Sequence, residues 1–163
     1  MSNENDKERS TEQNMEIEKS ESVPLNCKPS RAKASFGIWH DELRPSEITE
    51  MLAIEPERQR EKGEIRTTKS GTRVVSPTGC WIISSSRFIK TSDCNSHVDW
   101  ILDQLSSSSG ALRTLRKRGF RMQITCCVHV NHWNTAWQFE PDLLRKIGNL
   151  DIPLAVDVYD DVM

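Results

Sequence analysis

The residues most able to do chemistry cluster in segment 121–133, which reads RMQITCCVHVNHW. Cys126, Cys127, His129 and His132 fall within seven residues of one another. Thiolates and imidazoles are common zinc ligands, and a thiolate beside an imidazole is also how a cysteine nucleophile meets its base. This spacing raises two possibilities, a metal site and a catalytic dyad. The element that carries the residues decides between these and a purely structural role.

Apolar side chains alternate through this segment, which predicts a strand over about 120–130. One face carries Met122, Ile124, Cys126, Val128 and Val130, and the other carries Gln123, Thr125, Cys127 and His129. Cys126 is therefore expected in the core, where a thiol packs as a small hydrophobe. Side chains on one face of a strand recur about every 6–7 Å. That spacing exceeds the roughly 2.6–3.2 Å of a nucleophile–base hydrogen bond, so Cys127 and His129 are not expected to form a dyad.

We accordingly predict no metal ion, no cofactor and no catalytic residue. A zinc site would need His132 to return from the following turn and Cys80 or Cys94 to complete the set, and the sequence contains no Cys-x-x-Cys. Asp160 and Asp161 are adjacent near the end of the chain and are expected to be solvated rather than to act as an acid–base pair. The sequence does not decide whether the protein is an enzyme, but a non-enzymatic role is favoured.

Composition is consistent with one domain and a tail. The chain has 163 residues, a formal net charge of −2 and five irregularly spaced cysteines, which favours reduced thiols in a cytoplasmic protein. No signal peptide is visible, and no apolar run approaches the roughly 20 residues of a transmembrane helix, so a soluble protein is expected. Residues 1–30 hold seven acidic and four basic residues and no aromatic, which predicts a disordered tail before a domain at 31–163.

The remaining patterns predict alternating strands and helices. Strands are expected at 32–39, 79–85, 120–130, 137–139 and 152–159, and helices at 45–52, 93–105, 111–118 and 141–147. In the last strand, Leu154, Val156 and Val158 are expected to point inward. Residues 55–73 are expected to form a long charged loop with a short edge strand near 64–68. This order predicts an α+β fold, a ferredoxin-like sandwich with helices on one face of a mainly antiparallel sheet, extended by an extra β-α-β unit.

Several segments carry a family resemblance: WHDELRPSEITEMLAIEP (39–56), EKGE (61–64), CWIISSS (80–86), HVDWILDQL (97–105) and LDIPLAVDVY (150–159). Over roughly residues 32–160 they resemble the bacterial domain of unknown function family 4279 (DUF4279). The resemblance implies an α+β domain and a bacterial source, and supplies no established activity and no catalytic residue. Among small bacterial proteins of this kind, neutralisation of a toxin by an immunity-type protein is the function it brings into view.

A candidate binding surface follows from the charged segment 56–64, PERQREKGE. Its basic side chains could bind a carboxylate or a phosphate. Trp39 breaks the parity of its strand and is expected on the face away from the core, near Trp81. The predicted binding residues are Trp39, His40, Arg58, Arg60, Lys62 and Trp81. The leading interpretation is a non-enzymatic protein-binding module, because Trp and Arg are favoured at interfaces. In the competing account Trp39 packs under the loop and the loop's charges pair with one another.

Two other functions stay open. An enzyme or a small anionic-ligand binder could use Arg58 and Lys62 as anion contacts, and would need a pocket formed by the charged loop with Trp39, Trp81 and His40. RNA binding could use segment 113–121, RTLRKRGFR, which holds five basic residues. The sequence RGFRMQI resembles the RNA-recognition signature but lacks its further aromatics, so a nucleic-acid partner is not expected.

Overall fold

Apolar residues recur at every second position in the strands and at helical spacing elsewhere, and the two patterns build one layered structure. The computed structural model describes residues 28–132 and 134–161. The strands are β1 (Arg31–His40), β2 (Arg58–Arg60), β3 (Ile65–Thr67), β4 (Arg73–Val75), β5 (Gly79–Ser84), β6 (Arg121–Val130) and β7 (Leu154–Asp160). The helices are α1 (Pro45–Leu52), α2 (Cys94–Leu105), α3 (Ser109–Lys117) and α4 (Pro141–Leu150), with a 3-10 turn η1 (Ser85–Arg87).

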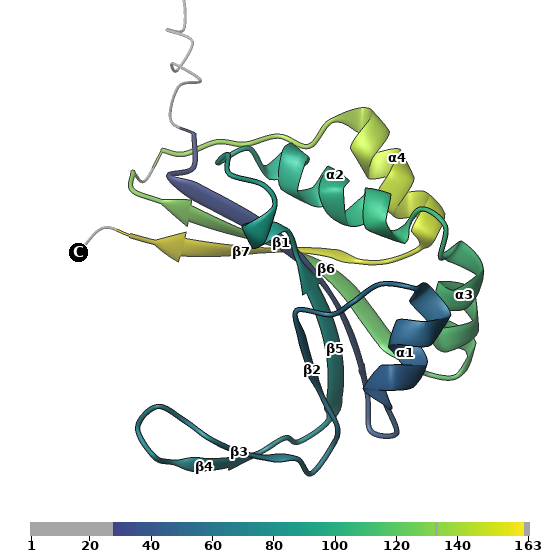
Figure 1. Ribbon diagram of the computed structural model, residues 1–163. Coiled ribbons are helices and arrows are strands. Elements are labelled where there is room, and N and C mark those ends of the chain that lie inside the picture. The colour runs from purple at the N-terminus through teal and green to yellow at the C-terminus, as the bar shows by residue number, and fades with distance from the viewer. Residues whose placement is uncertain (1–27, 133, 162–163) are drawn as a thin grey trace, which may run out of the picture.

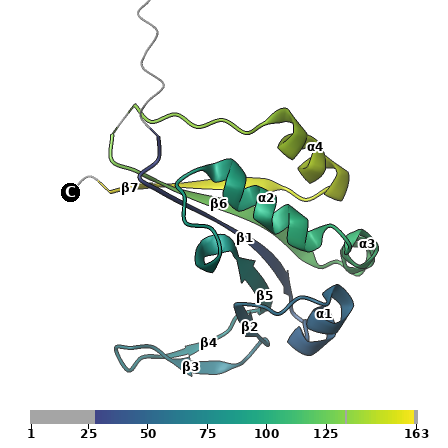
Figure 2. The same ribbon diagram turned by 45° about the horizontal axis from the view of Figure 1, so that its top comes forward.

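The main sheet has the strand order β2-β5-β1-β6-β7. All neighbours are antiparallel except β6 and β7, which are parallel and are joined through α4. The four helices cover one face of this sheet and leave the other bare, and the separate β3–β4 hairpin projects on the bare side (Figures 1 and 2). The predicted α+β class with a mostly antiparallel sheet is confirmed. The ferredoxin-like topology is not confirmed, since β6 and β7 are parallel neighbours.

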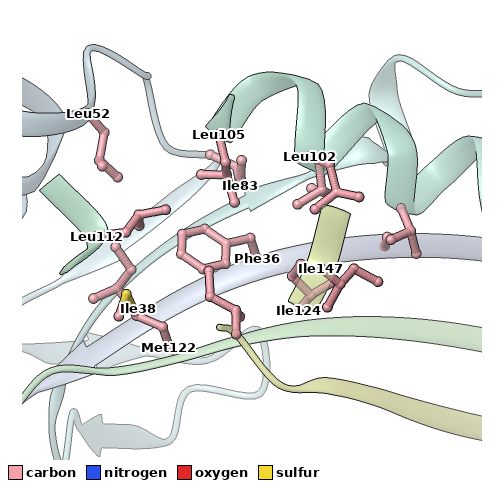
Figure 3. Close-up of a cluster of buried hydrophobic side chains, with 14 of the residues drawn as sticks. Phe36, Ile38, Leu52, Ile83, Leu102, Leu105, Leu112, Met122, Ile124 and Ile147 are labelled. Carbon is pink, nitrogen blue, oxygen red and sulfur yellow. The ribbon is translucent and has the colours of Figure 1, made fainter. Parts of the chain in front are cut away.

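The core fills the space between the sheet and the helices. Figure 3 shows Phe36 from β1 and Ile124 from β6 facing Leu102 and Leu105 of α2. All four side chains are buried. Burying one such side chain stabilises the folded state by about 1.5–3 kcal/mol relative to leaving it exposed. Side chains on the covered face therefore contribute most of the hydrophobic stabilisation. The bare face is not part of this core and can serve as a binding surface.

Helix boundaries follow local signals in the sequence. Pro45 occupies the first turn of α1, and the Asp93 carboxylate accepts hydrogen bonds from the Asn95 and Ser96 N–H groups at the start of α2. Gly119 has φ +85°, which lets the chain turn sharply after α3 into β6. The predicted starts of α1 and α2 and the predicted end of α3 are confirmed.

The expected long loop at 55–73 is wrong in part. Arg58–Arg60 forms β2, which pairs with β5 at the edge of the main sheet. The expected edge strand near 64–68 exists as β3 but pairs with β4 in the hairpin instead of joining the sheet. These short strands are mostly exposed, so they lack the apolar alternation by which a strand is recognised.

The expected strand at 137–139 is absent, and residues 135–140 have no regular structure. Trp137 and Phe139 are partly buried against the core. The backbone here bonds to a helix instead of a strand, because the Asn95 side chain donates to the Gln138 carbonyl at 2.9 Å and accepts from the Glu140 N–H at 3.0 Å. The alternating apolar side chains at 137 and 139 thus belong to an irregular segment packed against the core, not to a strand.

Strand β7 differs from prediction in its burial. By register Val156 and Val158 share the helix side of the sheet with Cys126 and Val128 of β6. The predicted inward direction is therefore confirmed, but the two side chains are 37% and 54% exposed and are not buried in the core. The cause is position, since β7 is an edge strand whose second half runs beyond the helices (Figures 1 and 2).

Apart from residues 28–30, the predicted tail lies outside the described residues. Within 28–132 and 134–161, no helix has both the length and the apolar character needed to cross a membrane.

Candidate functional site

The bare face of the sheet carries five transverse rows of side chains, because residues paired across neighbouring strands point to the same side. From one end to the other the rows are Arg60-Cys80-Trp39-Arg121, Arg58-Ile82-Gly37-Gln123, Ser84-Ser35-Thr125-Ala155, Lys33-Cys127-Asp157 and Arg31-His129-Tyr159. The first two rows hold three arginines and a tryptophan, and the third holds small side chains. The last row is also basic and aromatic, but its Arg31 and His129 side chains contact Asp161.

Trp39 dominates the end of the face that holds the first two rows. A Cβ placed on Gly37 would lie only 2.3 Å from Cη2 of the indole, so the ring lies across the backbone of its own strand. The half-buried ring borders two hollows of about 390 and 650 Å³. A side chain at residue 37 would displace the ring from this position. The ring is thereby presented flat on the sheet, with space on both sides.

Three arginines share this end of the bare face with the ring. Arg121 is its cross-strand neighbour on β6, Arg60 lies two strands away on β2 in the same row, and Arg58 is on β2 in the next row. None of the three has an ion-pair partner within the part of the chain that the structure describes. Glu57, the acidic residue beside Arg58, instead lies 3.8 Å from Arg87. We call Trp39, Arg58, Arg60 and Arg121 the tryptophan–arginine surface.

The predicted pairing of the two tryptophans is wrong. Trp81 is opposite Ile38 in the sheet, so it points to the helix side, whereas Trp39 points to the bare side. Trp81 is fully buried, and its Nε1 donates to Thr49 Oγ1 on α1 at 3.0 Å. The sheet thus separates the rings, and no pocket can form between them.

The other two predicted binding residues also lie outside this surface. The His40 ring stacks on Phe120 with centroids 4.3 Å apart. Lys62 Nζ is 2.5 Å from Asp41 Oδ2, and this hydrogen bond lowers the pKa of Asp41. Lys62 is therefore paired, but with a residue outside the loop, and no ion pair joins two residues within 56–64. Of the six predicted residues, the structure brings together Trp39, Arg58 and Arg60.

At the opposite end of the bare face, a polar cluster joins β1 to the end of β7. Asp161 lies 2.9 Å from His129 Nδ1 and 3.1 Å from Arg31, and Ser30 Oγ donates to the same carboxylate. Tyr159 stacks on the His129 ring. The hydrogen bond from His129, followed by that from Arg31, lowers the pKa of Asp161. Asp161 is exposed, as expected of a solvated end, but its carboxylate also joins β1 to the end of β7.

The division of the two adjacent cysteines is confirmed. Cys126 is fully buried on the helix side, and Cys127 is on the bare side, where burial raises the pKa of its thiol. Across residues 28–132 and 134–161, no group of three or more His, Cys, Asp or Glu side chains is arranged to hold a metal ion. His129, the nearest imidazole on the Cys127 side, bonds Asp161.

Sequence reasoning missed a buried serine–histidine pair. Ser85 Oγ lies 2.7 Å from His97 Nδ1, and His97 Nε2 lies 2.8 Å from the Thr91 carbonyl. Because a carbonyl only accepts, Nε2 carries the proton that bonds Thr91, and Nδ1 shares the single Ser85 hydroxyl proton with the Ala34 carbonyl, which lies 3.1 Å from Ser85 Oγ. This is the geometry of a nucleophile and its base, but the residues are 0% and 1% exposed and substrate cannot reach them. The pair instead ties segment 80–86 to α2. A histidine on the apolar stripe of α2 was the available signal.

The basic segment 113–121 does not form one surface. Arg116 donates to the Leu150 carbonyl and pairs with Asp151 at 2.9 Å. Arg118 pairs with Glu47 at 2.6 Å, and only Arg121 lies on the bare face. The fold therefore distributes these charges among separate contacts.

The fold and the bare face define the class: an α+β protein whose mixed sheet is covered by helices on one side and carries an uncovered aromatic and basic surface on the other. Within this class the chain belongs to the family described as Domain of unknown function (DUF4279), whose model matches residues 30–161. The resemblance seen in the sequence over roughly 32–160 is confirmed. No curated protein and no solved structure matches the chain.

Proposed function

We propose that the protein is a non-enzymatic binding module, and that its tryptophan–arginine surface holds an acidic segment of a partner protein. One observation carries the proposal: the half-buried Trp39 ring shares one end of the bare face with Arg58, Arg60 and Arg121, which have no ion-pair partner within residues 28–132 and 134–161. Unpaired guanidinium groups on an exposed sheet face are available to a ligand of opposite charge.

The chemistry of the surface selects the kind of ligand. A guanidinium group binds a carboxylate through two parallel hydrogen bonds, and it does so better than an ammonium group because it is planar. An indole ring adds a large apolar contact at small entropic cost, which is why tryptophan and arginine recur among the residues that dominate binding. A segment with two carboxylates flanking an apolar side chain satisfies both requirements.

The spacing of the row sets the length of that segment. Arg60 and Arg121 are three strands apart in one row, with Cys80 and Trp39 between them. At about 4.8 Å between strands, their backbones are about 14 Å apart. An extended chain advances about 3.3 Å per residue, so about four residues cross the row. A short acidic motif is therefore sufficient to contact both arginines and the ring between them.

An immunity-type role is a special case of this proposal, in which the partner is a toxin and its acidic segment is masked. We also propose, from the sequence, a bacterial source, a cytoplasmic location and a distant ferredoxin-like relationship. A small anionic ligand in the 390 Å³ hollow beside Arg58 and Lys33 is the alternative, and RNA is a third. The experiment below separates the three.

The test begins with display of random peptides against the full chain, because the partner is unidentified. We expect the selected peptides to be enriched in Asp and Glu next to an apolar residue. Fluorescence anisotropy then measures the affinity of one such peptide for wild type and for Arg58→Glu/Arg121→Glu. We expect at least a tenfold loss, which corresponds to about 1.4 kcal/mol.

The matched control is Arg113→Glu/Lys117→Glu, which makes the same change in charge at exposed residues of α3 on the helix side. We expect it to retain the peptide affinity. Equal weakening by both double variants would reduce the effect to net charge and contradict the proposal. So would selected peptides without acidic residues. Arg58-dependent binding of inorganic phosphate or of single-stranded RNA, tighter than that of the acidic peptide, would replace the proposal with one of its alternatives.

A further inference from the structure

Strand β7 forms one edge of the main sheet, and no strand of residues 28–132 and 134–161 pairs with its outer side (Figures 1 and 2). The opposite edge, β2, has only three residues and two of them are arginines. Short, charged edge strands resist pairing with another chain. Strand β7 has seven residues, so it is the edge of this sheet better suited to receive a further strand.

The hydrogen bonds at the two ends of β7 show which of its residues face outward. The Pro153 carbonyl accepts from the Ile124 N–H at 3.0 Å, and the Asp161 N–H donates to the Val130 carbonyl at 2.8 Å. In a parallel pair, every second residue of a strand directs both backbone groups to the same neighbour. The odd-numbered residues of β7 therefore bond β6, and the even-numbered residues direct their backbone groups to the outer edge.

Three of these even-numbered residues are apolar, namely Leu154, Val156 and Val158. Their side chains lie on the helix side of the sheet, where Val156 and Val158 are exposed. Outward backbone groups and exposed apolar side chains thus occur on the same residues, and an added strand would satisfy the first and cover the second. The bonds from Arg31 and His129 to Asp161 hold the end of this edge in position.

A second copy of β7 fits this edge best in one antiparallel register. Outward residues must oppose outward residues, which allows a two-fold axis at Ala155, Val156 or Asp157. An axis at Asp157 places two carboxylates directly opposite each other, which is unfavourable. An axis at Ala155 leaves Val158 beyond the start of the other copy's strand. An axis at Val156 opposes that residue to itself, Leu154 to Val158, and each Asp157 to an alanine.

We propose that two copies of the chain associate by antiparallel pairing of their β7 strands, with Val156 on the two-fold axis. Each outward pair exchanges two backbone hydrogen bonds, so the three apolar pairs supply about six. Opposed residues point to the same side of a sheet, so the helices of both copies cover one face and the two bare faces join. The inference is independent of the proposed binding function, because β7 contributes no residue to the tryptophan–arginine surface.

The contact is small, which sets its expected strength. Stable protein complexes typically bury about 1,200–2,000 Å², and one strand pair with three apolar side chains from each copy lies toward the lower end of that scale. We therefore expect a reversible dimer with a dissociation constant of about 10–100 μM.

The first experiment is sedimentation velocity of the full chain from about 5 to about 500 μM, because mass action shifts a dimer of this strength from mostly dissociated to mostly associated over that range. Dithiothreitol is included so that dimers linked through cysteines do not contribute. We expect the sedimentation coefficient to rise from that of a monomer toward that of a dimer. A chain that remains monomeric at the highest concentration would overturn the proposal.

The variant Val156→Pro tests the backbone contact. The Val156 N–H points to the outer edge, so losing it removes no hydrogen bond between β7 and β6. Pairing with a second copy loses about two bonds at the axis and meets the proline rings. We expect association to weaken at least tenfold while the urea midpoint stays close to that of wild type. Dimerisation at wild-type strength would contradict pairing through this edge.

A matched pair of lysine variants tests the apolar side chains. Val158 on β7 and Val75 on β4 are both valines on strands, with exposed fractions of 54% and 57%. Val158→Lys should weaken association at least tenfold, because the lysine opposes Leu154 of the second copy. Val75→Lys makes the same change on the separate hairpin and should leave association unchanged. Equal weakening by both variants would reduce the effect to charge and overturn the proposal.

The register is tested by opposite charges at Ala155, which lies opposite Asp157 of the second copy. Oppositely charged cross-strand pairs stabilise and like-charged pairs destabilise, and the two-fold axis applies each effect twice. We expect Ala155→Lys to tighten the dimer at least threefold and Ala155→Glu to weaken it at least threefold. The same response to both charges would contradict the axis at Val156. If Val156→Pro does not fold, the lysine pair and the Ala155 variants decide.

Discussion

The indole ring of Trp39 lies across the backbone of Gly37, two residues earlier on β1. Side chains two apart on a strand share a face, so a ring of this size can cover its neighbour only where that neighbour has no side chain. The contact holds the ring flat on the bare face, beside Arg121 of β6. An orientation that the proposed binding surface needs is thus encoded within three residues of one strand.

Replacing the glycine tests this orientation. In Gly37→Ala the new Cβ would lie 2.3 Å from Cη2 of Trp39, so the ring must move. Because the ring end is part of a mobile side chain, we expect unfolding free energy to fall by only about 1–2 kcal/mol. We expect acidic-peptide affinity to fall at least tenfold, together with a change in near-ultraviolet circular dichroism. The control is Gly110→Ala, because nothing lies within 4 Å of a Cβ added there. This variant should keep the wild-type peptide affinity and circular dichroism spectrum. An unaltered peptide affinity in Gly37→Ala would show that the flat ring is not needed.

Substitutions of the two tryptophans are expected to change different properties: peptide affinity for Trp39 and folding stability for Trp81. Trp39→Ala should weaken acidic-peptide binding by about 2 kcal/mol and affect folding little, because the ring is on the bare face. Trp81→Phe should lower the unfolding free energy by about 1–3 kcal/mol, because it removes the hydrogen bond to Thr49 and part of the core, and should leave peptide affinity unchanged. Urea unfolding and anisotropy on the same samples check both. Loss of peptide affinity in Trp81→Phe but not in Trp39→Ala would show that the binding surface lies elsewhere.

The buried Ser85–His97 hydrogen bond is expected to stabilise the fold. Ser85→Ala leaves His97 Nδ1 and the Ala34 N–H without the hydroxyl that bonds both. We expect each single alanine variant to lose about 1–3 kcal/mol. The double variant should lose less than the sum, because each single change already breaks the shared bond. Urea unfolding of all four proteins gives the coupling free energy, and strict additivity would contradict a direct bond.

The Asp161 cluster should make stability depend on pH at the acidic end. The pKa of Asp161 is lowered from its ordinary 3.8 in the folded protein by His129 and Arg31, so the folded state favours the ionised carboxylate. This contribution is present above pH 3.8 and is lost as the pH falls through the lowered pKa. Asp161→Asn should therefore have a lower urea midpoint than wild type at pH 7, and the difference should shrink steadily below pH 3.8.

A control for that experiment is Asp157→Asn on β7, the strand that Asp161 follows; Asp157 has no ion pair among residues 28–132 and 134–161. It should show no comparable change with pH. An Asp161→Asn difference of constant size from pH 7 down through the acidic range would indicate a steric effect in place of an electrostatic one.

Parity within each strand and local helix signals are properties of the sequence alone. The alternation alone predicts that Cys126 and Cys127 lie on opposite faces of the sheet, because successive side chains of an extended chain point to opposite sides. Asp93 and Gly119 similarly marked helix ends, because a carboxylate and a left-handed backbone satisfy groups within the same few residues. These features depend on neighbours in the chain, which the sequence states directly.

Everything that depends on which strand lies beside which was decided by tertiary structure. Trp39 and Trp81 both lie in strands with correct boundaries, yet only the register places them on opposite faces. Strand β2 and the Asp161 cluster owe their partners to residues 20 or more positions away. Such pairings are set by packing of the whole core, which no local pattern encodes.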